Sequence, residues 1–271
     1  MIVIKLMHGL GNQMFQYALG RSLSIRLNRN LFFDLSHYSN PYRLYNLHIF
    51  NIPEIVPFNK DMLEDETILV LREPSTSYCK TIFTLVRENK DPLYLSGFWQ
   101  SWKYFYKDEF IIKKDFSFKE NATGKWIPVL EKIKTTESVM VHIRRGDYLD
   151  PKFPNGVLPD TYLKKAMNKI SEKVRSPVFY FFSDDIRWCR ENIKVDAPHH
   201  FIDDDYSDPF SNYYFQLMCS CRHFIIANST FSWWAAWLAP YAGKTVIAPK
   251  MWYQKEEMNT PDIYLKNWIK L

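Results

Sequence analysis

The chain has 271 residues, of which 46% are apolar and 17% aromatic, and it carries a formal net charge of +5. This length corresponds to one large domain or two of ordinary size, and the apolar fraction is enough for two cores. Lys and Arg are spread along the chain rather than gathered in the basic stripe of a nucleic-acid-binding protein, so no nucleic-acid partner is expected. The mild positive charge fits an anionic small molecule or ordinary solubility equally well.

Targeting signals and metal motifs are not evident. The apolar run at residues 1–4 is too short for a signal peptide, and no stretch reaches the roughly 18 uncharged apolar residues of a membrane span. The cysteines at positions 79, 189, 219 and 221 match neither a paired CxxC zinc site nor a disulfide framework. We therefore predict a cytoplasmic protein with free thiols.

The first half opens with a β–loop–α–β pattern. A strand is predicted at 2–6, a polar glycine-containing turn at 8–13, a helix at 14–27 and a second strand at 31–34. This order is typical of doubly wound α/β folds. Prolines interrupt residues 36–92, which we interpret as an elaboration of the first domain before a short strand at 93–97.

The second half alternates more regularly. Strands are predicted at 138–143, 178–182, 200–202, 224–227 and 245–248, and helices at 160–173, 185–192, 209–220 and 230–238. Apolar strands that alternate with helices indicate a parallel sheet covered on both faces. The sequence therefore predicts two Rossmann-like domains, 1–125 and 126–271, which face each other across a ligand-binding cleft.

Charged residues stand at the end of the 138–143 strand. His142 and Arg144 should point to one side of it, and Arg145 to the other. Two guanidinium groups near the Asp147 carboxylate can bind a phosphate while one charge is balanced internally. The structural alternative is an Arg–Asp pair that only closes the end of the strand.

Two other strand ends carry polar groups suited to a nucleotide. Asn228, Ser229, Thr230 and Ser232 stand where a strand meets a helix, and hydroxyls with free first-turn N–H groups form an anion site. Asp184 can accept hydrogen bonds from a guanine or a ribose. Ordinary helix capping is the alternative at both places.

Two further segments need weighing. Residues 8–13 resemble a glycine-rich phosphate loop, but Met14 breaks the full GxGxxG motif, so we interpret them as a tight loop that faces the cleft. The aspartates at 203–205 could hold a divalent metal. We predict a metal-free site instead, because Arg144, Arg145 and the helix start at Thr230 already supply positive potential.

The sequence resembles the bacterial α-1,2-fucosyltransferases of glycosyltransferase family 11. The matching segments, in family order, are 8–18 (HGLGNQMFQYA), 97–101 (GFWQS), 141–148 (VHIRRGDY), 182–185 (FSDD) and 228–234 (NSTFSWW). The HxRRxD element is shared with other fucosyltransferases, whereas the first and last segments are typical of the α-1,2 group. Phe98-Trp99 departs from the Tyr-Phe or Tyr-Trp that is more frequent in the family.

The resemblance implies an α/β fold of GT-B type, a GDP-β-L-fucose donor, inversion at the anomeric carbon and no metal. It implies that Arg144 binds the β-phosphate and that His142 and Asp184 lie near the guanine. Ser229, Thr230 and Ser232 would line the nucleotide–phosphate side. The residues expected to face the reaction centre from the first domain are Gly11, Asn12 and Gln13.

The implied reaction transfers fucose to O2 of a terminal β-galactose. Asp147 is a candidate general base or a residue that orients Arg144, and His8 is a second candidate base. The acceptor would be a galactose-terminated oligosaccharide or lipid-linked precursor of O-antigen or capsule, with peripheral contact at the cytoplasmic face of the inner membrane. The alternatives are another GDP-sugar or acceptor hydroxyl, and a carbohydrate-binding module without catalysis.

Overall fold

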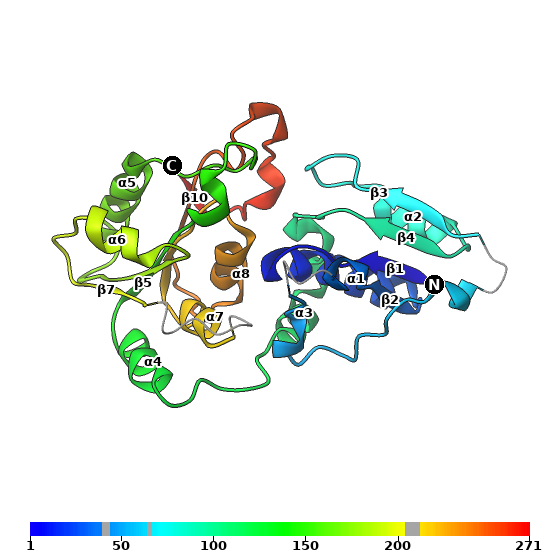
Figure 1. The fold of residues 1–271 in the computed structure, drawn as a ribbon, viewed down its shortest axis with the longest axis horizontal. Helices are drawn as coiled ribbons and strands as arrows, with labels where there is room; N and C mark the ends of the chain where they lie inside the picture. Colours follow the sequence, from blue (N-terminus) through cyan, green and yellow to red (C-terminus); the bar gives the residue numbers. More distant parts are fainter. Residues whose placement is uncertain (40–43, 64–66, 204–211) are drawn as a thin grey trace. The chain divides into compact units, whose positions relative to one another are not determined.

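The computed structural model describes residues 1–39, 44–63, 67–203 and 212–271, and the chain forms two compact units (Figure 1). Unit 1 comprises Met1–Lys119 with Thr260–Leu265, and unit 2 comprises Glu120–Asn259 with Lys266–Leu271. The chain thus passes between the units after Lys119 rather than after residue 125. The return of 260–265 to unit 1 was not predicted. It depends on long-range contacts, such as the 2.7 Å hydrogen bond from the Tyr78 N–H to the Asp262 carboxylate.

Unit 1 is built on a sheet of four parallel strands in the order β2-β1-β4-β3. The strands are β1 (Ile2–Lys5), β2 (Leu31–Asp34), β3 (Leu69–Arg72) and β4 (Leu93–Ser96), and the helices are α1 (Leu10–Leu27), α2 (Ile82–Glu88) and α3 (Glu109–Asp115). The predictions of β1, α1, β2 and β4 are confirmed. The sequence did not reveal β3, α2 and α3, because they are short and lie in or after the proline-interrupted region.

Helix α1 begins earlier than predicted. Gly9 has an extended backbone, and its carbonyl accepts hydrogen bonds from Asn12 N (2.9 Å) and Gln13 N (3.2 Å). Leu10 is 6% exposed and packs into the core of the unit from the first turn. The predicted loop at 8–13 is therefore wrong beyond Gly9, since Gly11, Asn12 and Gln13 belong to the first turn of the helix.

Unit 2 contains a six-stranded parallel sheet in the order β10-β9-β8-β5-β6-β7. Its strands are β5 (Ser138–Ile143), β6 (Val178–Ser183), β7 (His199–Phe201), β8 (His223–Ile225), β9 (Val246–Ala248) and β10 (Ile269–Lys270). From β5 the chain builds outward through β6 to β7, and from β8 it builds in the opposite direction. The strand order therefore reverses between β5 and β8, and open α/β sheets bind ligands beyond the strand ends at such a reversal.

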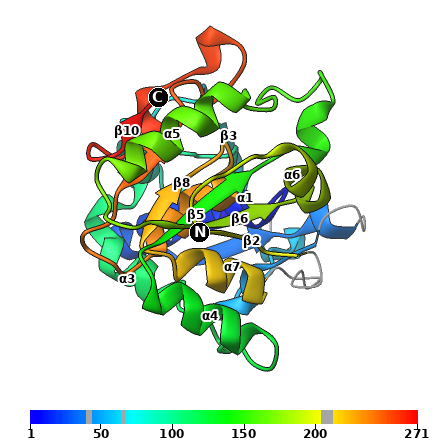
Figure 2. The ribbon, with the colours of Figure 1, turned by 90° about the vertical axis from the view of Figure 1, so that its left-hand side faces the viewer.

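Helices cover both faces of this sheet, as predicted. They are α4 (Trp126–Thr135), α5 (Asp160–Ser171), α6 (Ile186–Asn192), α7 (Asn212–Cys219) and α8 (Thr230–Leu238). Figure 2 shows α5 on one side of the sheet and α4 and α7 on the other. One core, which contains Val139, Val141 and Phe181, packs against α5 and α6. On the opposite face, the ring of Phe182 lies 5.2 Å from that of Tyr214 in α7.

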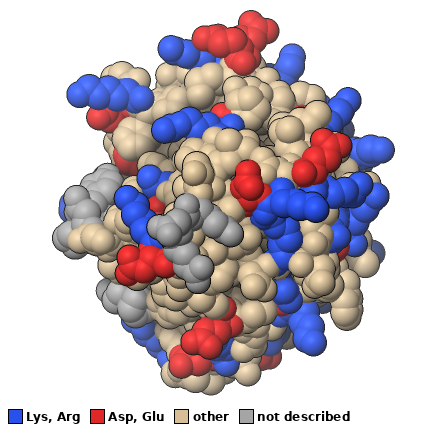
Figure 3. All heavy atoms as spheres, turned by 90° about the vertical axis from the view of Figure 1, so that its right-hand side faces the viewer, with Lys and Arg blue, Asp and Glu red and all other residues tan. Residues whose placement is uncertain are grey.

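The surface carries charge of both signs. On the face shown in Figure 3, acidic side chains lie among the basic ones, and apolar or uncharged surface separates many of them. Among the helices that the structure describes, none combines the length and the hydropathy that crossing a membrane would require.

Candidate functional site

The candidate site of unit 2 lies where β5 and β8 end, at the reversal of the strand order. Arg144 follows β5, and Thr230 begins α8 directly after the loop that leaves β8. Two contacts join these segments. The Arg144 guanidinium carbon lies 5.4 Å from the centroid of the Tyr148 ring, and the Tyr148 hydroxyl donates to the Asn228 carbonyl over 3.1 Å. The structure thus brings together two segments that the sequence had proposed separately for phosphate binding.

Arg144 is held between two carboxylates. Its Nη2 lies 2.5 Å from Asp147 Oδ1, and its Nη1 lies 2.9 Å from Asp184 Oδ2. The side chain is 24% exposed, so the group is accessible at one edge. A guanidinium has five N–H donors, and the two carboxylates need only one each. Donors therefore remain on a preorganised cation, which is what a phosphate oxygen requires.

Arg145 points to the other side of the strand end, as the alternation of side chains predicts. Its Nε lies 3.1 Å from Asp185 Oδ2, and its guanidinium packs 3.5 Å from the centroid of the Trp188 ring. Only 14% of the side chain is exposed. The prediction that Arg145 binds the donor stays untested, but its guanidinium is already engaged within unit 2.

Gly146 is required by the close approach of Asp184. A Cβ atom at this position would lie 2.4 Å from Asp184 Oδ2, far inside van der Waals contact. Asp184 also accepts a hydrogen bond from the Arg145 backbone N–H over 2.9 Å. The glycine of the predicted turn therefore serves to admit a carboxylate from the neighbouring strand end, where that carboxylate pairs with Arg144.

His142 is buried next to the site. This residue of β5 is 7% exposed. Its ring lies 6.2 Å from that of Phe231 in the first turn of α8, measured between centroids. Burial, with a smaller contribution from the Arg144 charge, lowers the pKa of His142 to about 3, so the imidazole is neutral at physiological pH. Its Nδ1 has no hydrogen-bond partner among the described residues.

Two residues of the predicted anion site are buried and form hydrogen bonds within unit 2. Asn228 is 1% exposed, and its amide donates to the carbonyls of Asn155 (2.9 Å) and Gly156 (3.1 Å). Ser232 is fully buried, and its hydroxyl donates to the Ser229 carbonyl over 3.1 Å. Both donors thus serve backbone carbonyls of unit 2, and the prediction that these two side chains contact the ligand stays untested.

Ser229 and Thr230 stand at the start of α8, where Ser229 is 7% exposed. Ser229 is the N-cap residue with an extended backbone, but its hydroxyl makes no capping hydrogen bond. The structure therefore does not support helix capping as the role of the Ser229 side chain. Thr230 is half-buried at the first helical position.

The residues predicted in unit 1 are largely structural. Gln13 is fully buried. Its Nε2 donates to the carbonyls of His8 and Leu44, each over 2.9 Å, and its Oε1 accepts from Asn46 N. The Gln13 amide is thus engaged within unit 1, and the prediction that it faces a reaction centre stays untested. Gly11 is buried in α1, and the half-buried Asn12 accepts a 2.8 Å hydrogen bond from Gln100.

The alternative metal site is only partly described. Asp203 forms an ion pair with Arg190, and positions 204 and 205 lie outside the described residues. Within residues 1–39, 44–63, 67–203 and 212–271, no group of three or more His, Cys, Asp or Glu side chains is arranged to hold a metal ion.

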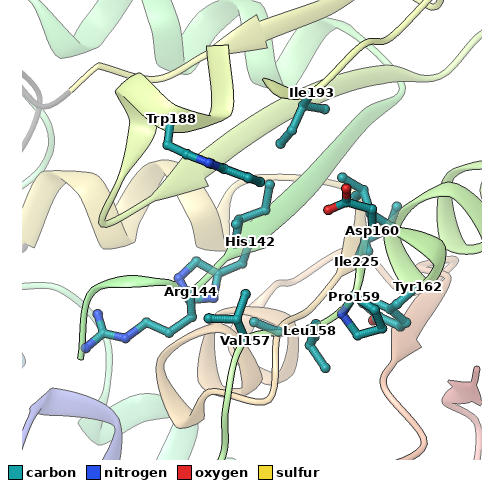
Figure 4. Close-up of a pocket in the computed structure, with 13 residues that line it drawn as sticks. His142, Arg144, Val157, Leu158, Pro159, Asp160, Tyr162, Trp188, Ile193 and Ile225 are labelled. Carbon is teal, nitrogen blue, oxygen red and sulfur yellow. The ribbon is translucent and has the colours of Figure 1, made fainter. Parts of the chain in front are cut away.

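A pocket adjoins the ends of β5 and β8 (Figure 4). Figure 4 shows the Arg144 guanidinium extending away from the apolar lining residues, while His142 lies close to them. Apolar walls with a few polar groups are typical of small-molecule sites. The lining residues are His142, Ile143, Arg144, Val157, Leu158, Pro159, Asp160, Tyr162, Leu163, Trp188, Ile193, Ile225 and Ala227.

Comparison with protein families decides the classification. The sequence model of the family described as "Glycosyl transferase family 11" matches residues 1–271, the whole chain. The chain belongs to glycosyl transferase family 11. It is 32% identical to an alpha-1,2-colitosyltransferase of Escherichia coli, with 100% of this chain and 98% of the relative covered.

Two further comparisons concern a partial relative and the fold. The chain is 34% identical to galactoside alpha-(1,2)-fucosyltransferase 1 of Saimiri sciureus, over 58% of this chain and 45% of that protein. The fold is similar to the crystal structure of NodZ alpha-1,6-fucosyltransferase soaked with GDP-fucose, with a TM-score of 0.53 and 12% identity. The matched region covers 88% of this chain and 92% of the NodZ chain. The predicted α/β fold of GT-B type with two Rossmann-like domains is confirmed.

Three residues that we did not predict contact or brace the predicted segments of this family 11 chain. Tyr148 links Arg144 to the start of α8, and Trp188 covers Arg145. Gln16 is fully buried, and its amide joins the ends of β1 and β4 by accepting from Met7 N and donating to the Gly97 carbonyl. Tyr148 and Gln16 both lie inside the matched segments, so their position beside the recognised residues was the available signal.

Proposed function

We propose that this family 11 enzyme transfers L-fucose from GDP-β-L-fucose to O2 of a terminal β-galactoside, with inversion at the anomeric carbon. One observation carries the proposal. In a chain that belongs to glycosyl transferase family 11, Arg144 stands between Asp147 and Asp184 where the strand order reverses, beside the start of α8.

The donor's diphosphate would bind at Arg144 and the first turn of α8. The remaining N–H donors of Arg144 and the backbone N–H groups after Ser229 provide positive potential for phosphate oxygens. The neutral His142 adds no second charge beside Arg144. The adjoining pocket, with Trp188 and Ile193 among its walls, offers an apolar surface for the guanine ring of the donor.

The reaction is a displacement at C1 of the fucosyl group. The acceptor O2–C1 bond forms, the bond from C1 to the β-phosphate oxygen breaks, and GDP leaves with the bonding electron pair. Arg144 stabilises the charge that develops on that oxygen, an electrostatic contribution of about 3–4 kcal/mol for a well-placed donor. We assign Asp147 to the orientation of Arg144, because its carboxylate is already paired with the guanidinium.

The acceptor's proton needs a base, and we assign this role to His8. Its side chain is exposed in unit 1, beyond the end of β1. We propose that no metal takes part, because Arg144 and α8 supply the positive potential that a metal would otherwise provide. The acceptor would be a galactose-terminated surface glycan precursor.

One observation favours a second donor. The E. coli relative that matches the full length of this chain is named as a colitosyltransferase. Colitose is fucose without the 3-hydroxyl group, so the two GDP-sugars share the guanosine, the diphosphate and the ring configuration at C1. The donor site described above would accept either, and the discrimination must come from contacts to O3.

A donor panel tests the proposal. The purified full-length protein is incubated with a β-galactoside, excess EDTA and GDP-fucose, GDP-colitose or GDP-mannose in turn. We expect GDP-fucose to give the highest kcat/KM. Higher kcat/KM with GDP-colitose would transfer the assignment to the second donor. Activity that EDTA abolishes and Mn²⁺ restores would contradict the metal-free mechanism, and turnover with none of the three donors would favour a binding module.

A further inference from the structure

Three rings meet at the carboxyl end of the unit 1 sheet. The His8 ring lies 5.1 Å from the His37 ring and 5.1 Å from the Phe98 ring, measured between centroids. His8 follows β1, His37 lies in the short 3-10 helix after β2, and Phe98 follows β4. The His8 and Phe98 side chains are exposed, Phe98 by 37%, so part of each ring remains accessible to solvent.

The backbone at His8 adopts a rare conformation to place its ring there. Its φ is +65°, in the left-handed region that non-glycine residues seldom occupy. The His8 carbonyl accepts hydrogen bonds from the buried Gln13 amide (2.9 Å) and from the Tyr38 hydroxyl (3.1 Å). Two side chains from elsewhere in the unit thus hold this turn in place.

A second set of contacts fixes the backbone that carries Phe98. Trp99 has a φ of +57°, again in the left-handed region. The Glu73 carboxylate accepts hydrogen bonds from Phe98 N (2.6 Å) and Trp99 N (2.9 Å). A Cβ on Gly97 would lie 2.4 Å from the Glu73 Cβ, so only glycine admits this carboxylate.

Left-handed backbone at bulky residues costs free energy and persists where surrounding contacts enforce it, frequently at functional sites. Here two separately braced turns bring the exposed Phe98 ring against the His8 imidazole, which in turn contacts the His37 imidazole. A phenyl face packs against the C–H face of a pyranose, and imidazole nitrogens exchange hydrogen bonds with its hydroxyls. We propose that His8, His37 and Phe98 form a subsite for the pyranose ring of the acceptor, an inference that rests on the proposed function.

The experiment measures acceptor binding and turnover separately in the full-length protein. Saturation-transfer NMR with methyl β-D-galactopyranoside, without donor, reports binding, and steady-state kinetics report KM for acceptor and donor. For Phe98→Ala we expect loss of the NMR signal and an acceptor KM raised about tenfold, a change typical of losing one stacking contact. The donor KM and the hydrolysis of GDP-fucose should change less than twofold, and Phe98→Tyr should restore acceptor binding.

Two further variants make the result specific. His37→Gln should also raise the acceptor KM without changing the donor KM. Phe110→Ala is the matched control, because this aromatic side chain is 81% exposed elsewhere in unit 1 and should leave both constants unchanged.

Either of two results would overturn the subsite: an unchanged acceptor KM in Phe98→Ala, or an increase confined to the donor KM. A wild-type protein that binds the galactoside through Phe98 yet transfers no fucose would refute the proposed function while supporting the subsite. Fucose transfer that does not depend on Phe98 or His37 would support the proposed function and refute the subsite.

Discussion

Arg144 Nη1 lies 2.9 Å from Asp184 Oδ2, an ion pair that joins the carboxyl ends of the neighbouring strands β5 and β6. Because Asp147 holds the other terminal nitrogen, the guanidinium is fixed before any ligand arrives. A preorganised charge does not have to be reoriented during the reaction, which is the main source of electrostatic catalysis.

Removal of the Arg144 guanidinium should therefore abolish most transfer. We expect Arg144→Ala to lower kcat/KM by about 10²–10³-fold, the range for the loss of one transition-state donor. Arg144→Lys should recover only part of this, because an ammonium cannot contact two carboxylates and a phosphate in the same plane. Arg187→Ala is the control, since the Arg187 side chain is 90% exposed. Near-normal turnover in a folded Arg144→Ala protein would refute the donor-site assignment.

A methyl group at position 146 should also lower activity, because it would act on Arg144 through Asp184. In Gly146→Ala the new Cβ would displace the Asp184 carboxylate, so Arg144 loses one of its two anchors. We expect kcat/KM to fall at least about tenfold while the thermal transition stays cooperative. In the control Gly243→Ala, the Cβ would meet the exposed Tyr241 ring at 3.2 Å, which can move aside. Equal activities of the two variants would show that the Arg144–Asp184 pair is dispensable.

His142 should make stability sensitive to acid. Its pKa is about 3 in the folded protein and about 6.5 in an unfolded chain. Between these values only the unfolded chain binds the proton, so the free energy of unfolding falls as the pH drops below 6.5, by up to about 1.4 kcal/mol per pH unit. Urea unfolding between pH 6.5 and 4.5 should show a shallower pH dependence in His142→Asn than in the wild type. Identical slopes would argue that His142 is not buried and neutral.

Gln13 should affect stability rather than donor binding. Gln13→Ala leaves the carbonyls of His8 and Leu44 and the N–H of Asn46 without this partner. We expect the free energy of unfolding to fall by about 1–3 kcal/mol, the range for loss of a buried hydrogen-bonding partner. Calorimetric titration should give a Kd for GDP within about twofold of the wild-type value. A large loss of GDP affinity with unchanged stability would restore the ligand-binding interpretation of Gln13.

The sequence predicted the second sheet well because its strands are nearly continuous apolar runs. Strand β5 and helix α8 begin and end where predicted, and most residues of both are buried. Periodicity fails for β3, whose residues are mostly exposed at the edge of the unit 1 sheet, and for the short α2 and α3.

The candidate site shows a similar limit. Position after a strand correctly placed Arg144 at a strand end, because parallel strands deliver their carboxyl ends to one edge. The same rule could not show which groups the polar side chains near these strand ends would contact. Asn228, Ser232 and Gln13 have polar side chains in the right segments, but whether an amide or hydroxyl faces a ligand or a backbone carbonyl depends on tertiary packing.

Transfer of fucose to O2 of a galactoside with inversion can be read from the product itself. NMR analysis of the product formed by the full-length protein from GDP-β-L-fucose and a β-galactoside gives both the linkage and the anomeric configuration. We expect an α-anomeric fucosyl signal correlated across the glycosidic bond to C2 of galactose. A β-linked product, a bond to another hydroxyl, or release of free fucose without transfer would contradict it.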